Sequence, residues 1–272
     1  MNSFKYCYGP VGSWRLGVSL GIDPVSQPEK ICTFDCTYCQ LGTRAAQAAR
    51  RQVYVSPADL GAELDLIKAP ADYLTFSGRG EPTMASNLPE LLLECGHRRP
   101  EKTAIITNAS MMYSEKVREE LASFDFVLAK LDAPDSGLFG SINRPGPGVY
   151  FEEVLRGLIL FSKGRRGRLA IQTMVLAANK DQAKGLARLY ADIGPDEVQL
   201  NTPLRPCAER PLPREELEAV AAAVSAELSR LGAGAIRIIN VYGEKAPEVE
   251  PVSAPDTLLR RGKTRGGKEG GK

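Results

Sequence analysis

The chain has 272 residues, of which 43% are hydrophobic and 25% charged, and its formal net charge is +2. This is the composition of a globular protein long enough to bury a full core, and its charge neither requires nor excludes a nucleic-acid partner. No apolar run approaches the ~20 residues that cross a bilayer, and the N-terminal stretch lacks the apolar segment of a secretory signal. We therefore expect a cytoplasmic protein.

Short β-rich runs alternate with segments of helical apolar spacing along most of the chain. The strands are expected, in chain order, at residues 16–23, 72–78, 102–108, 124–132, 168–176 and 196–202. The helices are expected at residues 56–69, 88–99, 114–122, 150–163, 179–192 and 213–231. Such alternation predicts parallel strands joined by right-handed crossovers. Six units rather than eight predict an α/β fold with a partial (β/α)6 barrel of the TIM type.

Two local patterns refine this expectation. Ser56 and Pro57 predict the start of the first helix, with Ser56 as its N-cap. Residues 235–243 are a candidate for an added strand. We expect one core domain over residues 1–245, followed over residues 246–272 by a Pro-rich and then Gly/Lys-rich flexible tail.

Three cysteines follow the first expected strand in the stretch ICTFDCTYCQLG, where Cys32, Cys36 and Cys39 have the spacing C-x3-C-x2-C. Thiols stay reduced in the cytoplasm, so this cluster indicates metal binding or catalysis rather than disulfides. In an α/β fold of parallel strands, functional residues gather in the loops after the strands, which is where these cysteines lie.

Zinc and iron–sulfur sites are the two alternatives for such a cluster. A structural zinc site needs four ligands, but the chain has one histidine, His97, and its other cysteines lie far away in the sequence. Cys95, on the apolar face of an expected helix, is better interpreted as a core residue. Three thiolates on a four-iron cluster would leave one iron open, which is typical of a catalytic site. A structural-zinc module that binds RNA or protein remains the alternative.

The pattern Cys32, Cys36, Tyr38, Cys39 resembles the C-x3-C-x-aromatic-C signature of the radical S-adenosylmethionine (radical SAM) superfamily. The resemblance implies that the three cysteines hold a [4Fe–4S] cluster whose open iron binds S-adenosylmethionine. It further implies reductive cleavage to a 5′-deoxyadenosyl radical, which abstracts a hydrogen atom from an unidentified substrate. A reductant such as flavodoxin or ferredoxin would supply the electron.

Further residues are candidates for binding this cofactor. TFSGRGEPT, residues 75–83, resembles the superfamily's Gly-Gly-Glu motif: Gly78 and Gly80 would allow a close approach of the backbone, and Glu81 would accept from the methionyl ammonium. Lys130 and Asp132 share one face of a strand and would meet the carboxylate and the ribose hydroxyls, unless they are a surface ion pair. The remaining candidates, for adenine or ribose contacts, are Tyr38, Asn108, Gln172 and Asn201.

Longer runs between residues 8 and about 206, such as YGPVGSWRLGVSLGID, INRPG and QLNTPLRP, resemble the group of wyosine-base synthases and their uncharacterised bacterial relatives. Wyosine-forming enzymes carry an additional N-terminal cysteine set, whereas this chain has only Cys7 there. The substrate stays open among RNA, as in tRNA base modification of the wyosine type, a peptide and a small metabolite. Cys207 is either a loop thiol without a role or a group facing the site. Arg144 and Arg205 either grip an anionic substrate or lie on the surface.

Overall fold

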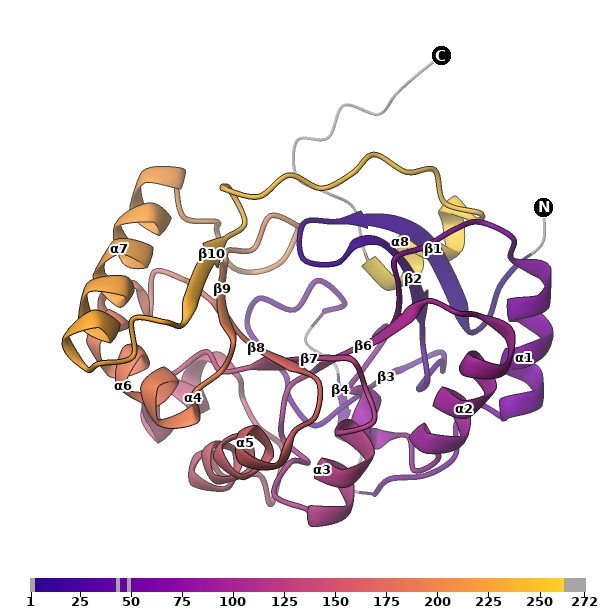
Figure 1. Cartoon of the computed structure of the whole chain (residues 1–272), viewed down its shortest axis with the longest axis horizontal. Helices are drawn as coiled ribbons and strands as arrows, with labels where there is room; N and C mark the ends of the chain where they lie inside the picture. Colours follow the sequence, from indigo (N-terminus) through magenta and orange to yellow (C-terminus); the bar gives the residue numbers. More distant parts are fainter. Residues whose placement is uncertain (1–2, 43–44, 48–49, 262–272) are drawn as a thin grey trace.

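The computed structural model describes residues 3–42, 45–47 and 50–261, and its main feature is one curved sheet of eight strands (Figure 1). In sheet order the strands are β1 (Cys7–Ser13), β2 (Gly17–Ile22), β5 (Tyr73–Phe76), β6 (Lys102–Thr107), β7 (Phe126–Lys130), β8 (Arg168–Met174), β9 (Glu197–Asn201) and β10 (Arg237–Asn240). β1 is antiparallel to β2, and all other neighbours are parallel. The sheet does not close, because β1 and β10 do not pair with each other.

Helices cover the outer face of this sheet, except α8, which lies beside β1 (Figure 1). They are α1 (Pro57–Leu66), α2 (Leu88–Arg98), α3 (Glu115–Leu121), α4 (Ser136–Ile142), α5 (Phe151–Gly164), α6 (Ala183–Ile193), α7 (Arg214–Arg230) and α8 (Ala254–Arg261). The 3-10 turns η1 (Pro82–Met84) and η2 (Lys180–Gln182) and a small sheet of β3 (Lys30–Cys32) and β4 (Ala45–Gln47) complete the fold. No helix in the described part of the chain is both long and apolar enough to cross a membrane.

The expected fold class is confirmed, since all six expected strands are present as β2 and β5 to β9, and all six expected helices are found. Ser56 caps α1 as expected by accepting from the backbone N–H of Asp59 at 3.1 Å. The added strand is β10. The sequence did not predict β1, because its glycines and proline favour a turn rather than a strand. It also did not predict α4 and α8, which are too short to show a clear helical period.

The two faces of the sheet differ in what they bury. Side chains alternate between the faces of a strand, so one row of β7 faces the helices and the other faces the barrel interior. The interior row begins with Phe126 and Leu128, which pack with Leu16, Ala104 and Ala170 in a small apolar cluster that includes no helix residue. Beyond this cluster the same row becomes polar at Lys130. The interior is therefore apolar near the strand starts and polar near the strand ends.

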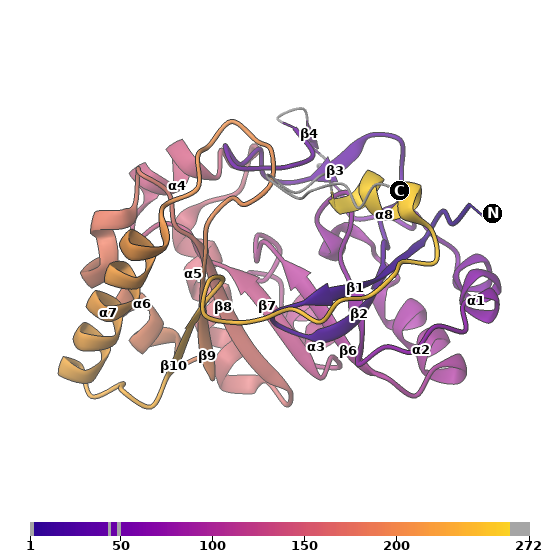
Figure 2. The ribbon, with the colours of Figure 1, turned by 90° about the horizontal axis from the view of Figure 1, so that it is seen from above.

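The segment after β10 crosses the open side of the barrel and reaches β1, as the views of Figures 1 and 2 agree. The backbone N–H of Val252 donates to the carbonyl of Gly9 at 2.7 Å, and Ser253 forms an antiparallel bridge with Gly9. A Cβ at Gly12 would lie 1.7 Å from the carbonyl oxygen of Pro247, so only glycine allows this approach. The segment thus covers an edge of the sheet that would otherwise stay open.

α8 follows this segment and docks on the N-terminal strands through a buried ion pair. Arg260 Nε lies 3.1 Å from Asp23 Oδ2, and the two side chains are 2% and 0% exposed. Arg260 also donates to the carbonyl of Lys5, while Asp256 accepts from the N–H of Phe4 at 2.9 Å. The sequence placed α8 in a flexible tail, whereas the described part of that tail is bound to the core. The boundary at residue 245 itself stays a prediction.

Replacing Arg260 by methionine is expected to lower the free energy of unfolding by about 3–5 kcal/mol, because Asp23 would keep a buried charge without its partner. Urea titration followed by circular dichroism measures this loss. The matched control is Arg214→Met, which removes an ion pair with Glu218 in which both side chains are about half exposed (51% and 49%) and should leave stability nearly unchanged. Equal midpoints for the two variants would contradict the docking of α8.

Candidate active site

Cys32 ends β3, Cys36 and Cys39 lie on the loop that follows, and backbone hydrogen bonds hold this loop against the end of α4. The N–H of Asp35 donates to the carbonyls of Asn143 and Arg144, each at 3.1 Å, and the N–H of Thr37 donates to the carbonyl of Ile142 at 2.9 Å. Cys39 turns back so that its N–H donates to the carbonyl of Cys36 at 3.0 Å. The end of α4, a helix that the sequence did not predict, therefore supports the cysteine loop. All three cysteines are reduced.

The Gly-Gly-Glu-like motif pairs directly with the cysteine loop. The N–H of Glu81 donates to the carbonyl of Ile31 at 2.7 Å, and Gly80 forms a parallel bridge with Ile31. A Cβ at Gly80 would lie 1.8 Å from that carbonyl oxygen. Gly78 has φ +153°, and a Cβ there would lie 2.3 Å from the Asp23 carboxyl carbon. Both glycines are therefore required by close packing, whatever the cofactor.

The Glu81 carboxylate is buried and joins the ends of β5 and β6. Its Oε1 accepts from the N–H and hydroxyl of Thr83, at 3.0 and 2.7 Å, and from the hydroxyl of Thr107 at 2.6 Å. Its Oε2 accepts from the N–H of Asn108 at 2.6 Å. Burial raises the pKa of Glu81, and these four hydrogen bonds oppose that shift. Only Oε2 keeps room for a further donor.

A second polar network surrounds Asp132 just beyond the end of β7. Lys130 Nζ lies 3.3 Å from Asp132 Oδ1 and 4.8 Å from the centre of the Tyr38 ring. Asp132 Oδ2 accepts from the Tyr38 hydroxyl and from Asn143 Nδ2, the latter at 2.7 Å, while Oδ1 accepts from the N–H of Met174 at 2.7 Å. The Asp132 side chain is 0% exposed. This is a buried network rather than a surface ion pair, and both Asp132 oxygens already accept hydrogen bonds within it.

The thiols have polar neighbours from both networks. Asn108 Nδ2 donates to Cys32 Sγ at 3.7 Å, and Asn143 Nδ2 donates to Cys36 Sγ at 3.5 Å. Burial raises the pKa of Cys32 to about 12 and that of Cys36 to about 11, with smaller contributions from Glu81 and Asp132 respectively. Without a cation, these two thiols therefore stay protonated at neutral pH.

Lys30 and Asn143 are two residues of this site that the sequence did not single out. Burial would lower the pKa of Lys30, but the nearby Cys39 and Cys32 raise it overall. The Lys30 side chain is 6% exposed and its Nζ donates to the carbonyl of Gly42 at 3.0 Å. A lysine at the first position of a strand of three residues gives no local signal. Asn143 lies in the INRPG stretch, where the sequence pointed to its neighbour Arg144, which is exposed.

The other candidates lie at different distances from these networks. Gln172 pairs with Lys130 in the register of β7 and β8. When its side-chain amide is turned so that the oxygen faces Arg15, which satisfies both groups, that oxygen accepts from Arg15 Nε and Nη2 at 2.7 and 2.5 Å. Asn201 ends β9, and its amide oxygen accepts from the N–H of Thr202 at 2.9 Å. Among the remaining cysteines, Cys7 and Cys95 are buried in the core, and Cys207 donates to the carbonyl of Glu209.

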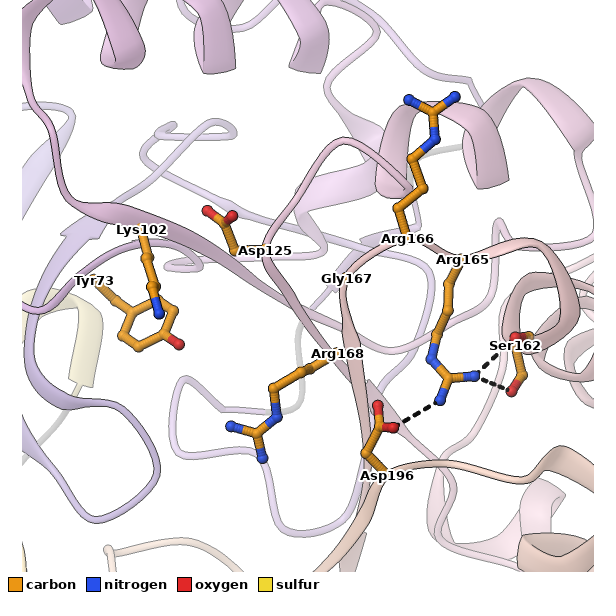
Figure 3. Close-up of a pocket in the computed structure, with 9 residues that line it drawn as sticks. All are labelled: Tyr73, Lys102, Asp125, Ser162, Arg165, Arg166, Gly167, Arg168 and Asp196. Carbon is orange, nitrogen blue, oxygen red and sulfur yellow. Dashed lines mark hydrogen bonds and ion pairs between the residues drawn. The ribbon is translucent and has the colours of Figure 1, made fainter.

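Two geometric findings bear on the kind of site. Within the described ranges, no three side chains of His, Cys, Asp or Glu lie close enough together to hold a single metal ion. A cavity of about 520 Å³ lies at the opposite edge of the sheet, where β6 and β8 begin (Figure 3). Two of its arginines are neutralised, since Arg165 lies 3.0 Å from Asp196 and Arg168 lies 3.3 Å from Glu197. That edge serves stability in barrels of this kind, so we place the candidate site at the strand ends.

Comparison with known proteins points to one family. The model of the radical SAM superfamily matches residues 28–190. The chain is 41% identical over 217 residues to a UPF0026 protein of Synechocystis sp., which covers 79% of this chain and 80% of that relative.

Solved structures share the fold. SuiB of Streptococcus suis, bound to S-adenosylmethionine, has a TM-score of 0.60 at 18% identity and matches 78% of this chain but 48% of its own, so the chain spans about half of SuiB. An archaeal TYW1 has a TM-score of 0.53 at 17% identity, over 77% of this chain and 72% of its own.

Replacing Glu81 by alanine is expected to lower the free energy of unfolding by about 3 kcal/mol or more, because buried donors of Thr83, Thr107 and Asn108 lose their acceptor. Glu81→Gln should lose less, since one amide oxygen remains. Urea unfolding measures both, with Glu218→Ala on the exposed face of α7 as the control. An unfolding midpoint unchanged in Glu81→Ala would show that this carboxylate does not hold the strand ends.

Proposed function

The chain belongs to the radical SAM superfamily, and we propose that Cys32, Cys36 and Cys39 hold a [4Fe–4S] cluster to which S-adenosylmethionine binds. The observation that carries this proposal is the set of three cysteines, none in a disulfide, at the end of β3 and on the loop after it, inside the matched range of residues 28–190. The enzyme would act on a substrate that is not identified by the fold alone.

The donor set fits such a cluster. Thiolates are the protein ligands of iron–sulfur clusters, and each would bind a different iron atom, so three ligands need not converge on one point. Asn108 and Asn143 already point amide N–H groups at Cys32 and Cys36, which would stabilise sulfur that carries negative charge. Lys30, which interacts with Cys39 and Cys32, adds a positive charge near these two thiols. Iron would supply the cation that the raised pKa values of these thiols require.

When bound and reduced, the cluster supplies the electron that cleaves S-adenosylmethionine to a 5′-deoxyadenosyl radical. The chain's own residues would bind and orient the cofactor around it. Lys130 Nζ is the available cation for the methionyl carboxylate, and Glu81 Oε2 the available acceptor for the methionyl ammonium. Asp132 would act through others, because its oxygens already hold Tyr38 and Lys130 in place.

The remaining candidates would complete the cofactor site. Gly78 and Gly80 bring the β5 loop against the cysteine loop, and Asn108, Gln172 and Asn201 would offer amide groups to adenine or ribose. A reductant such as flavodoxin or ferredoxin would deliver the electron. The relatives leave the substrate class open, since SuiB is also known bound to its precursor peptide SuiA.

The cluster is tested by replacing each of the three cysteines with alanine in anaerobically reconstituted protein. Each variant should lose the bound iron and the absorbance near ~400 nm, and should form no 5′-deoxyadenosine from S-adenosylmethionine and dithionite. Cys95→Ala, in the core and away from the loop, is the matched control and should keep all three.

Retained cleavage in the Cys39→Ala variant would contradict the assignment. Stoichiometric zinc in colourless wild-type protein, with no 5′-deoxyadenosine formed, would favour the structural-zinc module instead.

Lys130→Met is expected to weaken S-adenosylmethionine binding about tenfold or more without loss of iron, because the carboxylate loses its cationic partner. Asp132 keeps the donors of Tyr38, Asn143 and Met174, so its network should persist. Calorimetry on the reconstituted protein measures the affinity, and Lys130→Arg should restore part of it. Unchanged affinity in Lys130→Met would exclude this role.

A further inference from the structure

Three arginines from distant segments meet beside the proposed cofactor site. Arg15 lies in the turn between β1 and β2, Arg205 follows β9, and Arg261 ends α8. Arg205 donates to the backbone carbonyl of Arg261 and to Gln40 Oε1, the latter at 3.0 Å. Arg15 donates to Gln172. All three side chains are partly buried.

These three guanidinium groups have no carboxylate partner among the described residues. Within residues 3–42, 45–47 and 50–261, no carboxylate lies at ion-pair distance from any of them. Burial lowers the pKa of Arg15, and the charges of Arg261 and Arg205 lower it further. Burial and Arg261 likewise lower the pKa of Arg205.

Several other buried or partly buried arginines of this chain are neutralised by carboxylates. Arg51 pairs with Glu120, and Arg260, the neighbour of Arg261, pairs with Asp23 at 3.1 Å. Bringing like charges together out of water raises the free energy of the folded protein unless an anion arrives. Among the described residues, Arg79 and Arg118 also have only backbone carbonyls as acceptors, but each is a single group, whereas the cluster brings three guanidinium groups without a carboxylate together.

The position of the cluster links it to the proposed chemistry. Gln40, which accepts from Arg205, directly follows Cys39. Gln172, which accepts from Arg15, lies beside Lys130 in the strand register. The arginines thus lie next to the cysteine loop and Lys130, on the open side of the barrel. On this side lie the segment of residues 246–253, which crosses the barrel, and α8.

We propose that Arg15, Arg205 and Arg261 bind a phosphate group of the substrate, so that a phosphorylated metabolite is held in the barrel interior. The planar fork of arginine matches phosphate oxygens, and several guanidinium groups favour a doubly charged phosphate over a single carboxylate. Partial burial of all three side chains favours a small phosphate ester over the backbone of an RNA, which would need an exposed basic surface. The inference deepens the proposed function and rests on it only for the place of the cofactor.

The test is calorimetric titration of the full chain with inorganic phosphate, with acetate as the comparison anion, before and after anaerobic reconstitution. Wild-type protein should bind one phosphate and should bind acetate at least about tenfold more weakly. Arg15→Gln, Arg205→Gln and Arg261→Gln should each weaken phosphate binding about tenfold or more. Arg205→Lys should recover part of the loss, because it restores the charge without the fork.

Arg166→Gln is the matched control, since it removes the same charge from an exposed position at the opposite edge of the sheet and should leave binding unchanged (Figure 3). Equal weakening in this control, equal binding of acetate, or no saturable phosphate binding would overturn the proposal. Loss of phosphate binding once the cluster and S-adenosylmethionine are present would overturn it too, because the arginines would then serve the cofactor.

A short single-stranded RNA that binds more than about a hundredfold more tightly than inorganic phosphate would also overturn the metabolite proposal, in favour of RNA. Because the titration does not depend on turnover, its outcome can be separated from failure of the proposed cofactor chemistry. Phosphate binding without 5′-deoxyadenosine formation would reject the cofactor proposal alone. The reverse result would reject this inference alone.

Discussion

One buried carboxylate, that of Glu81, fixes the relation between the sheet and the cysteine loop. Its oxygens tie the end of β5 to Thr107 and Asn108 at the end of β6, while its own N–H holds Ile31, one residue before Cys32. A charged group in this position is costly to bury, and four donors offset that cost. The loop therefore takes its place from the strand ends and from α4, rather than from any element of its own. A site built in this way is organised before a cofactor arrives.

The barrel interior is lined by apolar, packed side chains near the strand starts and by polar side chains near the strand ends. On β7 the inward row reads Phe126, Leu128 and Lys130, and the apolar members pack with residues of neighbouring strands. Parallel pairing places the same change from apolar to polar at the same height on adjacent strands, as with Ala170 and Gln172 on β8. The polar groups meet because all carboxyl ends share one edge. The cavity lined by Arg165 and Arg168 lies at the opposite edge, where the strands begin, and is therefore separate from the cysteines.

The parts of this arrangement that the sequence predicted are those with local signals. Strand and helix periods, the Ser56 cap and the spacing of the cysteines all depend on neighbours within a few residues, and they placed the motif after the right strand. Asn143 could not be assigned in this way, because its contacts with Asp132 and Cys36 depend on how the α4 turn meets a loop about a hundred residues earlier. Nor could α8, whose polar composition suggested a tail, although Arg260 finds its partner 237 positions away in Asp23. An ion pair between residues far apart in the chain produces no local pattern that a single sequence could reveal.

Charge balance in the interior shows which buried cations already have an anionic partner and which have none within the described chain. Lys130 is matched by Asp132, and Lys30 lies where thiolate charge would develop. Asp23, whose pKa burial raises to about 6, is matched by Arg260. The charge of each of these groups is balanced by a partner in the chain or by the proposed cluster. The charges of Arg15 and Arg205 are not balanced by any carboxylate in the described chain. Their hydrogen bonds to Gln172 and Gln40 orient the guanidinium groups without neutralising them. Neutral amides that fix the direction of a buried cation leave its charge available, which is the condition that an anionic ligand requires.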